Sequence, residues 1–115
     1  MFAGFVVNGT GGRRLLIRGV GPTLTQSFSL SSALNSTRSQ LLDSAQIEHF
    51  TNDGWGLAAW ADQSQTEFGH VGAFPLISNS NDAVIFGRVD PGQYNVILSS
   101  PSGTTGLGLV EVYED

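Results

Sequence analysis

The chain contains no cysteine and no lysine, and charged residues make up only 13% of its 115 residues. Without cysteine it has no disulfide, no thiol nucleophile and no thiolate metal ligand. Without lysine it lacks the phosphate-binding loop of nucleotide-binding proteins, although residues 9–12 and 19–21 are rich in glycine. Five arginines stand against ten acidic residues, and the net charge is -5. Because binding of a phosphate backbone requires clustered cations, we expect no nucleic-acid partner.

Long apolar runs and a recognisable targeting segment are also missing. We expect no membrane span, because no stretch is apolar over the length of a bilayer, and residues 1–4 do not resemble the start of a signal peptide. Fifteen glycines and many Ser, Thr and Asn residues in a weakly charged chain are typical of secreted all-β modules. The composition therefore favours an extracellular or cell-surface location.

The pattern that is present is that of short strands separated by turns. Residues 82–90, 93–98 and 107–113 alternate apolar and polar side chains between breaks at Pro91-Gly92 and at residues 103–106, which predicts a closing three-stranded meander. Residues 2–8 and 13–20 predict a hairpin across a glycine-rich turn. Weaker patterns predict strands at residues 39–43 and 46–51 and extended chain at residues 71–77.

One segment departs from the strand pattern. Residues 57–62 are compatible with one or two helical turns, in which Leu57 and Trp60 share a face. Short strands at turn spacing with one short helical insertion predict an all-β fold, an antiparallel β-sandwich or jelly roll, over a single domain of residues 1–115. An open barrel is the alternative.

Most of the chain also resembles a known type of domain. The stretches that carry the resemblance are residues 3–7 (AGFVV), 16–24 (LIRGVGPTL), 51–55 (TNDGW), 71–76 (VGAFPL), 81–83 (NDA) and 103–113 (GTTGLGLVEVY). Through them the sequence is similar to a repeat β-sandwich domain of large secreted proteins from verrucomicrobial and related bacteria, and loosely to pre-peptidase C-terminal domains. The resemblance implies an accessory, surface or adhesive module and implies no catalytic residue. It also implies a strand upstream of residue 1, and the departure of residues 35–42 from the family pattern implies that this edge is built differently.

Oxygen-bearing side chains gather in the predicted turns. Asn52, Asp53 and Asp82 are the strongest candidates for a calcium site, because calcium takes six to eight oxygen ligands and loops of a sandwich converge at its ends. Asp43, Asn79 and Asn81 belong to the same group. Asn and Asp are equally expected in turns for conformational reasons alone, and the spacing is not that of an EF-hand loop.

Aromatic and histidine residues supply the other candidates. Trp55 and Trp60 lie in the most irregular segment and could stack on a sugar ring, or could belong to the core. His49 and His70 are the only imidazoles, and the sequence shows neither a nucleophile elbow nor an orienting carboxylate for them.

Three functions follow from these patterns. The leading hypothesis is a non-catalytic extracellular module for adhesion, assembly or accessory binding, with a glycan or protein ligand. A small calcium-assisted hydrolase acting on an ester, lactone or glycoside through a histidine and Asp53 is one alternative, and a carbohydrate-binding module is the other. Residues 2–7 carry no charge, which predicts self-association by strand addition, as a dimer or as a fibre.

Overall fold

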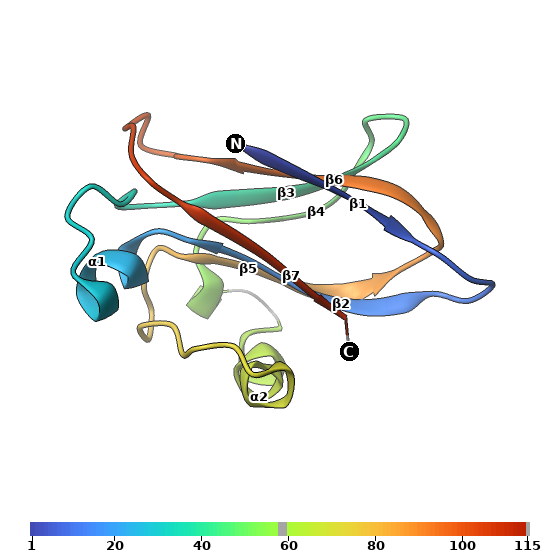
Figure 1. Cartoon of the computed structure of the whole chain (residues 1–115), viewed down its shortest axis with the longest axis horizontal. Helices are drawn as coiled ribbons and strands as arrows, with labels where there is room; N and C mark the ends of the chain where they lie inside the picture. Colours follow the sequence, from blue (N-terminus) through green and yellow to red (C-terminus); the bar gives the residue numbers. More distant parts are fainter. Residues whose placement is uncertain (58–59, 115) are drawn as a thin grey trace.

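Two antiparallel sheets lie face to face in the computed structural model, which describes residues 1–57 and 60–114. One sheet has four strands in the order β1-β6-β3-β4, and the other has three in the order β5-β2-β7. Helix α2 and its neighbouring segments lie below the three-stranded sheet, on the side away from the first sheet (Figure 1). The fold is therefore all-β and sandwich-like, as predicted. The elements are β1 (Phe2–Val7), β2 (Arg13–Val20), α1 (Pro22–Phe28), β3 (Arg38–Asp43), β4 (Glu48–Asn52), the 3-10 helix η1 (Trp55–Leu57), α2 (Ala61–Val71), β5 (Ala83–Val89), β6 (Gly92–Ser99) and β7 (Leu109–Glu114).

Strand β2 is buried on both faces and separates two hydrophobic clusters. Leu15 and Ile17 face the four-stranded sheet, whereas Leu16 and Val20 face the helices, as the two-residue period of a strand requires. The first cluster fills the space between the sheets and contains Val7, Leu15, Ile17, Leu41, Ile85, Val89, Tyr94 and Val96. The second lies between the three-stranded sheet and the helices and contains Leu16, Val20, Leu24, Trp55, Phe68, Leu76 and Val84.

Two of the predicted strand pairings are wrong. Strands β1 and β2 are not a hairpin, because β1 pairs with β6 and β2 pairs with β5 and β7. Strands β5, β6 and β7 do not form a meander, because β6 belongs to the other sheet. The turns between these strands carry the chain from one sheet across to the other. Alternating hydrophobicity is the same for a strand that pairs with its neighbour in sequence and for one that packs over it, so the pattern alone could not separate the two.

The helical content is larger than predicted. Helix α1 was not expected, although Pro22 occupies the first turn, where proline is favoured. The predicted turn at residues 57–62 falls partly on residues 58–59, which lie outside the described residues, so a shared face of Leu57 and Trp60 stays a prediction. Helix α2 begins at Ala61 and ends at Val71, and Gly72 caps it in a left-handed conformation with φ of 75°. The extended chain predicted at residues 71–77 is wrong at its start, because Val71 still belongs to α2, and residues 72–77 belong to no strand.

Candidate functional site

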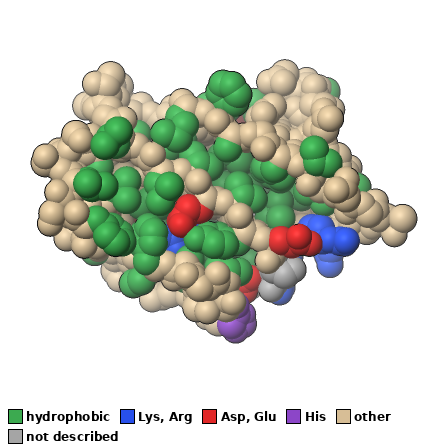
Figure 2. All heavy atoms as spheres, viewed as in Figure 1, with side chains coloured by type: hydrophobic (Ala, Val, Ile, Leu, Met, Phe, Trp, Pro, Cys, Tyr) green, Lys and Arg blue, Asp and Glu red, His purple; other side chains and the backbone are tan. Residues whose placement is uncertain are grey.

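One side of the sandwich is open. Strand β1 pairs only with β6 and strand β7 only with β2, so each is an edge strand. Figure 1 looks into the sandwich from this side, where both strands run in front. A cleft of about 320 Å³ lies between them, lined by Phe5, Val6, Val7, Asn8, Arg13, Leu15, Val112 and Glu114. Hydrophobic side chains cover much of this face (Figure 2).

Strand β1 is the edge that carries no charged side chain. Its side chains alternate, with Phe2 75% and Val6 56% exposed, while Phe5 and Val7 point inward. The Phe5 ring stacks on Tyr94 with 5.7 Å between ring centroids, which anchors the strand to the core. The other edge strands all include charges: Glu48 in β4, Arg88 in β5, and Glu111 and Glu114 in β7. Charged side chains at a sheet edge oppose pairing with another chain, and β1 lacks this protection.

The opposite side of the sandwich is closed. The Val84 N–H of β5 donates to the Asn52 side-chain oxygen at 2.9 Å, and the Val84 carbonyl accepts a hydrogen bond from the Trp60 indole N–H at 2.8 Å. These side chains therefore occupy backbone groups that an edge strand would otherwise leave free. The Phe50 ring of β4 lies over Gly87, where an added Cβ would come within 2.9 Å of the ring. Side chains thus seal the β4/β5 side.

The two tryptophans predicted to bind a ligand have different surroundings. Trp55 is only 4% exposed, belongs to the second hydrophobic cluster and donates its indole N–H to the Ile77 carbonyl at 3.0 Å. Trp60 is half-buried and packs edge-on against Phe50, with 6.2 Å between ring centroids. The structure therefore gives both rings a packing role, and stacking on a sugar by Trp55 would require the core to open.

The three predicted metal ligands also have separate roles. Asp53 is exposed and forms an ion pair with Arg38 at 3.1 Å. The Asn52 side chain caps β5, as described above, and also bonds to the Gly54 backbone. Within residues 1–57 and 60–114, no group of three or more His, Cys, Asp or Glu side chains is placed to hold a metal ion. Calcium binding by this set stays a prediction.

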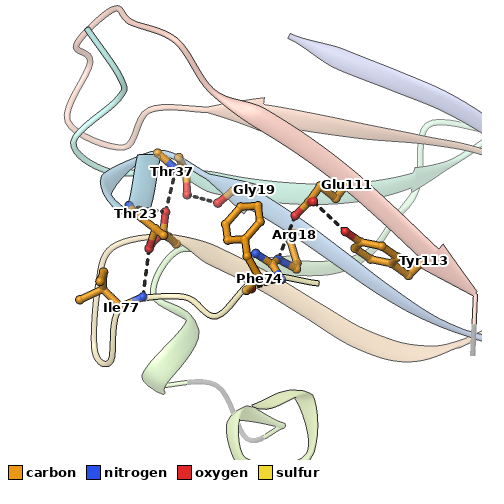
Figure 3. Close-up of polar contacts among 10 residues, drawn as sticks. Arg18, Gly19, Thr23, Thr37, Phe74, Ile77, Glu111 and Tyr113 are labelled. Carbon is orange, nitrogen blue, oxygen red and sulfur yellow. Dashed lines mark hydrogen bonds and ion pairs between the residues drawn. The ribbon is translucent and has the colours of Figure 1, made fainter. Parts of the chain in front are cut away.

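Asp82 organises the loops near α1. It is fully buried, and its carboxylate accepts hydrogen bonds from the Gly21 N–H at 2.7 Å, from the Thr23 N–H at 3.3 Å, and from the Thr23 and Ser80 hydroxyls. The first two donors belong to the start of α1, where free N–H groups favour a negative charge. The Thr23 hydroxyl in turn accepts the Ile77 N–H at 3.0 Å (Figure 3). The carboxylate therefore ties the start of α1 to the loop between α2 and β5.

Each histidine contacts a carboxylate. His49 lies 2.8 Å from Asp43 and His70 lies 3.2 Å from Glu67. The hydrogen bond from His49 is the main cause that lowers the pKa of Asp43, and the backbone N–H of Ile47 adds to it. Neither pair lines the cleft on the open side. The Asp53 carboxylate, which the hydrolase hypothesis invoked, is paired with an arginine instead.

A buried arginine is the polar feature that sequence reasoning missed. Arg18 is fully buried between the Phe68 and Phe74 rings, with 4.7 and 4.4 Å from its guanidinium carbon to the ring centroids. Its Nη1 donates to the Phe74 carbonyl at 2.7 Å, and its Nε lies 3.0 Å from Glu111 (Figure 3). Burial lowers the pKa of Arg18, and the Glu111 charge opposes this change. The ion pair gives the buried cation a counter-charge, whereas Arg18 Nε and Nη2 and Glu111 Oε1 make no hydrogen bond within the described part of the chain.

No described helix is long and apolar enough to cross a membrane. Comparisons of the chain with protein-family models, with curated proteins and with solved structures find no match.

Proposed function

We propose that this chain is a non-catalytic β-sandwich module for adhesion or assembly, and that it acts through its open β1/β7 side. The observation that carries the proposal is the contrast between the two sides of one sandwich. On one side Asn52 and Trp60 occupy the backbone groups of Val84, whereas on the other side β1 presents an uncharged edge with exposed Phe2 and Val6. Unpaired strand edges beside apolar side chains are a common way to bind another extended chain.

The polar clusters support a structural role rather than a catalytic one. Asp82 connects α1 to the loop between α2 and β5, and Arg18 with Glu111 connects β2 to β7. Both lie in the interior, away from the cleft. We place the module outside the cell or at its surface, a proposal supported by the low charge and the many Gly, Ser, Thr and Asn residues.

Sedimentation velocity from micromolar to millimolar protein tests the proposal. We expect the wild-type protein to associate as its concentration rises, and Val6→Lys to remain monomeric because it places a charge on the β1 edge. Thr51→Lys is the matched control, since Thr51 is also exposed and lies on the other edge strand of the same sheet. It should associate like the wild type. A wild-type protein that is monomeric throughout the series would contradict the proposal, provided that circular dichroism shows the variants folded.

A further inference from the structure

The backbone of β1 has a defined set of groups that point to the open edge. The Met1 carbonyl accepts the Leu98 N–H at 2.9 Å and the Met1 amino group lies 3.4 Å from the Leu98 carbonyl, so these two residues form a hydrogen-bonded pair. Such pairs alternate along an antiparallel ladder. Ala3, Phe5 and Val7 therefore bond to β6. The remaining residues of the strand, Phe2, Gly4 and Val6, direct their N–H and C=O groups away from β6.

These free groups are self-complementary. If a second copy of β1 lies antiparallel to the first with a two-fold axis at Gly4, Gly4 faces Gly4 of the copy and Phe2 faces Val6 of the copy. Every outward N–H and C=O of Phe2, Gly4 and Val6 then has a partner, because each facing pair exchanges two hydrogen bonds. Axes at Phe2 or at Val6 would leave part of this set unpaired.

The side chains agree with the same register. Phe2 and Val6 are 75% and 56% exposed in the single chain, and in this register each covers the other across the new ladder. Aromatic and β-branched residues are a favourable cross-strand pair. At the axis Gly4 has no side chain, so the two copies meet there without a steric obstacle.

Strand β1 of a second copy fits the β1 edge better than β4, β5 or β7 of a second copy does. Pairing of β1 with β4 of another copy would bring the uncharged strand beside Glu48 and would build an open chain of molecules. The β5 edge is occupied at Val84 by two side chains, and β7 carries Glu111 and Glu114. Pairing β1 with β1 involves no charged residue of either strand, and its two-fold symmetry closes the assembly at two molecules.

We infer that two copies of this chain join through β1, antiparallel and two-fold symmetric at Gly4, into one continuous sheet formed by both four-stranded sheets. The inference rests on the proposed function, which it makes specific by naming the partner and the register.

Variants with a single introduced cysteine test this register directly, because the natural chain contains no cysteine. Facing residues in a hydrogen-bonded pair have Cα atoms about 5.5 Å apart, within the range of a disulfide. Gly4→Cys should therefore form a covalent dimer in a glutathione redox buffer. Phe2→Cys or Val6→Cys alone should react at least about tenfold more slowly, since each would lie roughly 13 Å from its own copy, beyond the reach of a disulfide. An equimolar mixture of these two variants should form the mixed disulfide.

The mixture of Phe2→Cys and Val6→Cys also controls for a local effect of the Gly4→Cys substitution. A Cβ at Gly4 would come within 3.1 Å of the Asn95 side-chain oxygen, whereas the mixture leaves Gly4 unchanged. Fast self-crosslinking of Val6→Cys or Phe2→Cys, or no mixed disulfide while the wild-type protein still associates, would overturn the register and leave the proposed function standing. A wild-type protein that does not associate at any concentration would overturn both.

Discussion

Replacing Glu111 with glutamine is expected to lower the free energy of unfolding by about 3 kcal/mol, because it leaves the buried Arg18 without a counter-charge. Arg18 is fully buried, while the Glu111 side chain is 16% exposed. Glutamine keeps the shape of the side chain and an oxygen that accepts the Tyr113 hydroxyl, which now donates to Glu111 at 2.7 Å. The variant therefore isolates the charge.

Because Glu111 is partly exposed, removing Arg18 and removing Glu111 should lower the stability by different amounts. Removal of Arg18 leaves a carboxylate whose side chain is 16% exposed and which keeps the hydrogen bond from Tyr113, whereas removal of Glu111 leaves a fully buried cation enclosed by Phe68 and Phe74. Arg18→Met should therefore cost less than Glu111→Gln. A double variant, Arg18→Met with Glu111→Leu, should regain most of the loss, since apolar replacements of buried pairs are often neutral.

Urea unfolding followed by circular dichroism measures these differences. With a slope of about 1.5 kcal/mol per molar urea, a loss of about 3 kcal/mol lowers the midpoint by about 2 M. Glu114→Gln is the matched control, because Glu114 lies on the same strand and pairs with Arg13 at 2.9 Å but is 61% exposed. It should change stability by less than about 0.5 kcal/mol. Equal midpoints for the two variants would refute the reasoning.

Four further predictions concern the other polar and titratable groups. Asp82→Ala should cost about 3 kcal/mol or more, because it leaves several buried donors unpaired, whereas Asp53→Ala should be near neutral. If calcium binds as the sequence suggests, the melting temperature should be higher in calcium than in chelator and Asp53→Ala should remove the difference; equal temperatures for the wild type would contradict the site. The pKa of Asp43 lies below its ordinary value, so the contribution of this carboxylate to stability is present at neutral pH and is lost as the pH falls through that lowered pKa. In His49→Ala, a carboxyl NMR titration should show the Asp43 pKa rising toward the ordinary value. No change in that pKa would contradict the hydrogen bond from His49. Burial raises the pKa of both tyrosines, so the unfolded chain loses their protons first and stability should fall as the pH rises above the ordinary tyrosine range; an ultraviolet titration that matches free tyrosine would disagree.

The strands were predictable because their signal is local. Strand β2 spans residues 13–20, as predicted from its apolar residues and the glycines on either side. An exposed edge at residues 2–7 was expected because the family resemblance implies a further strand upstream. The pairing was not predictable in the same way. Gly9 and Gly92 have positive φ angles of 107° and 157°, and glycines of this kind serve a reversal within one sheet and a crossing between two sheets equally well.

The polar residues proposed as site candidates show a related limit of prediction from local sequence. Asp82 and Asp53 look alike as turn residues, yet one is fully buried under hydrogen bonds and the other is exposed. The difference arises from α1, whose free N–H groups approach Asp82 from a segment some sixty residues away along the chain. Trp55 and Trp60 likewise sit in a polar stretch of sequence but find carbonyl partners at Ile77 and Val84. Contacts of this range leave no trace in local composition.

The capping of Val84 by Asn52 and Trp60 bears on how many neighbours one molecule would take under the inferred β1 pairing. With β5 occupied at Val84 and with charges on β4 and β7, that pairing would join each molecule to one other, at β1. A module that binds only one partner forms dimers and does not polymerise. Two long polypeptides that each carry several such modules would therefore be joined by separate pairwise contacts, each of which could break under force without breaking the others.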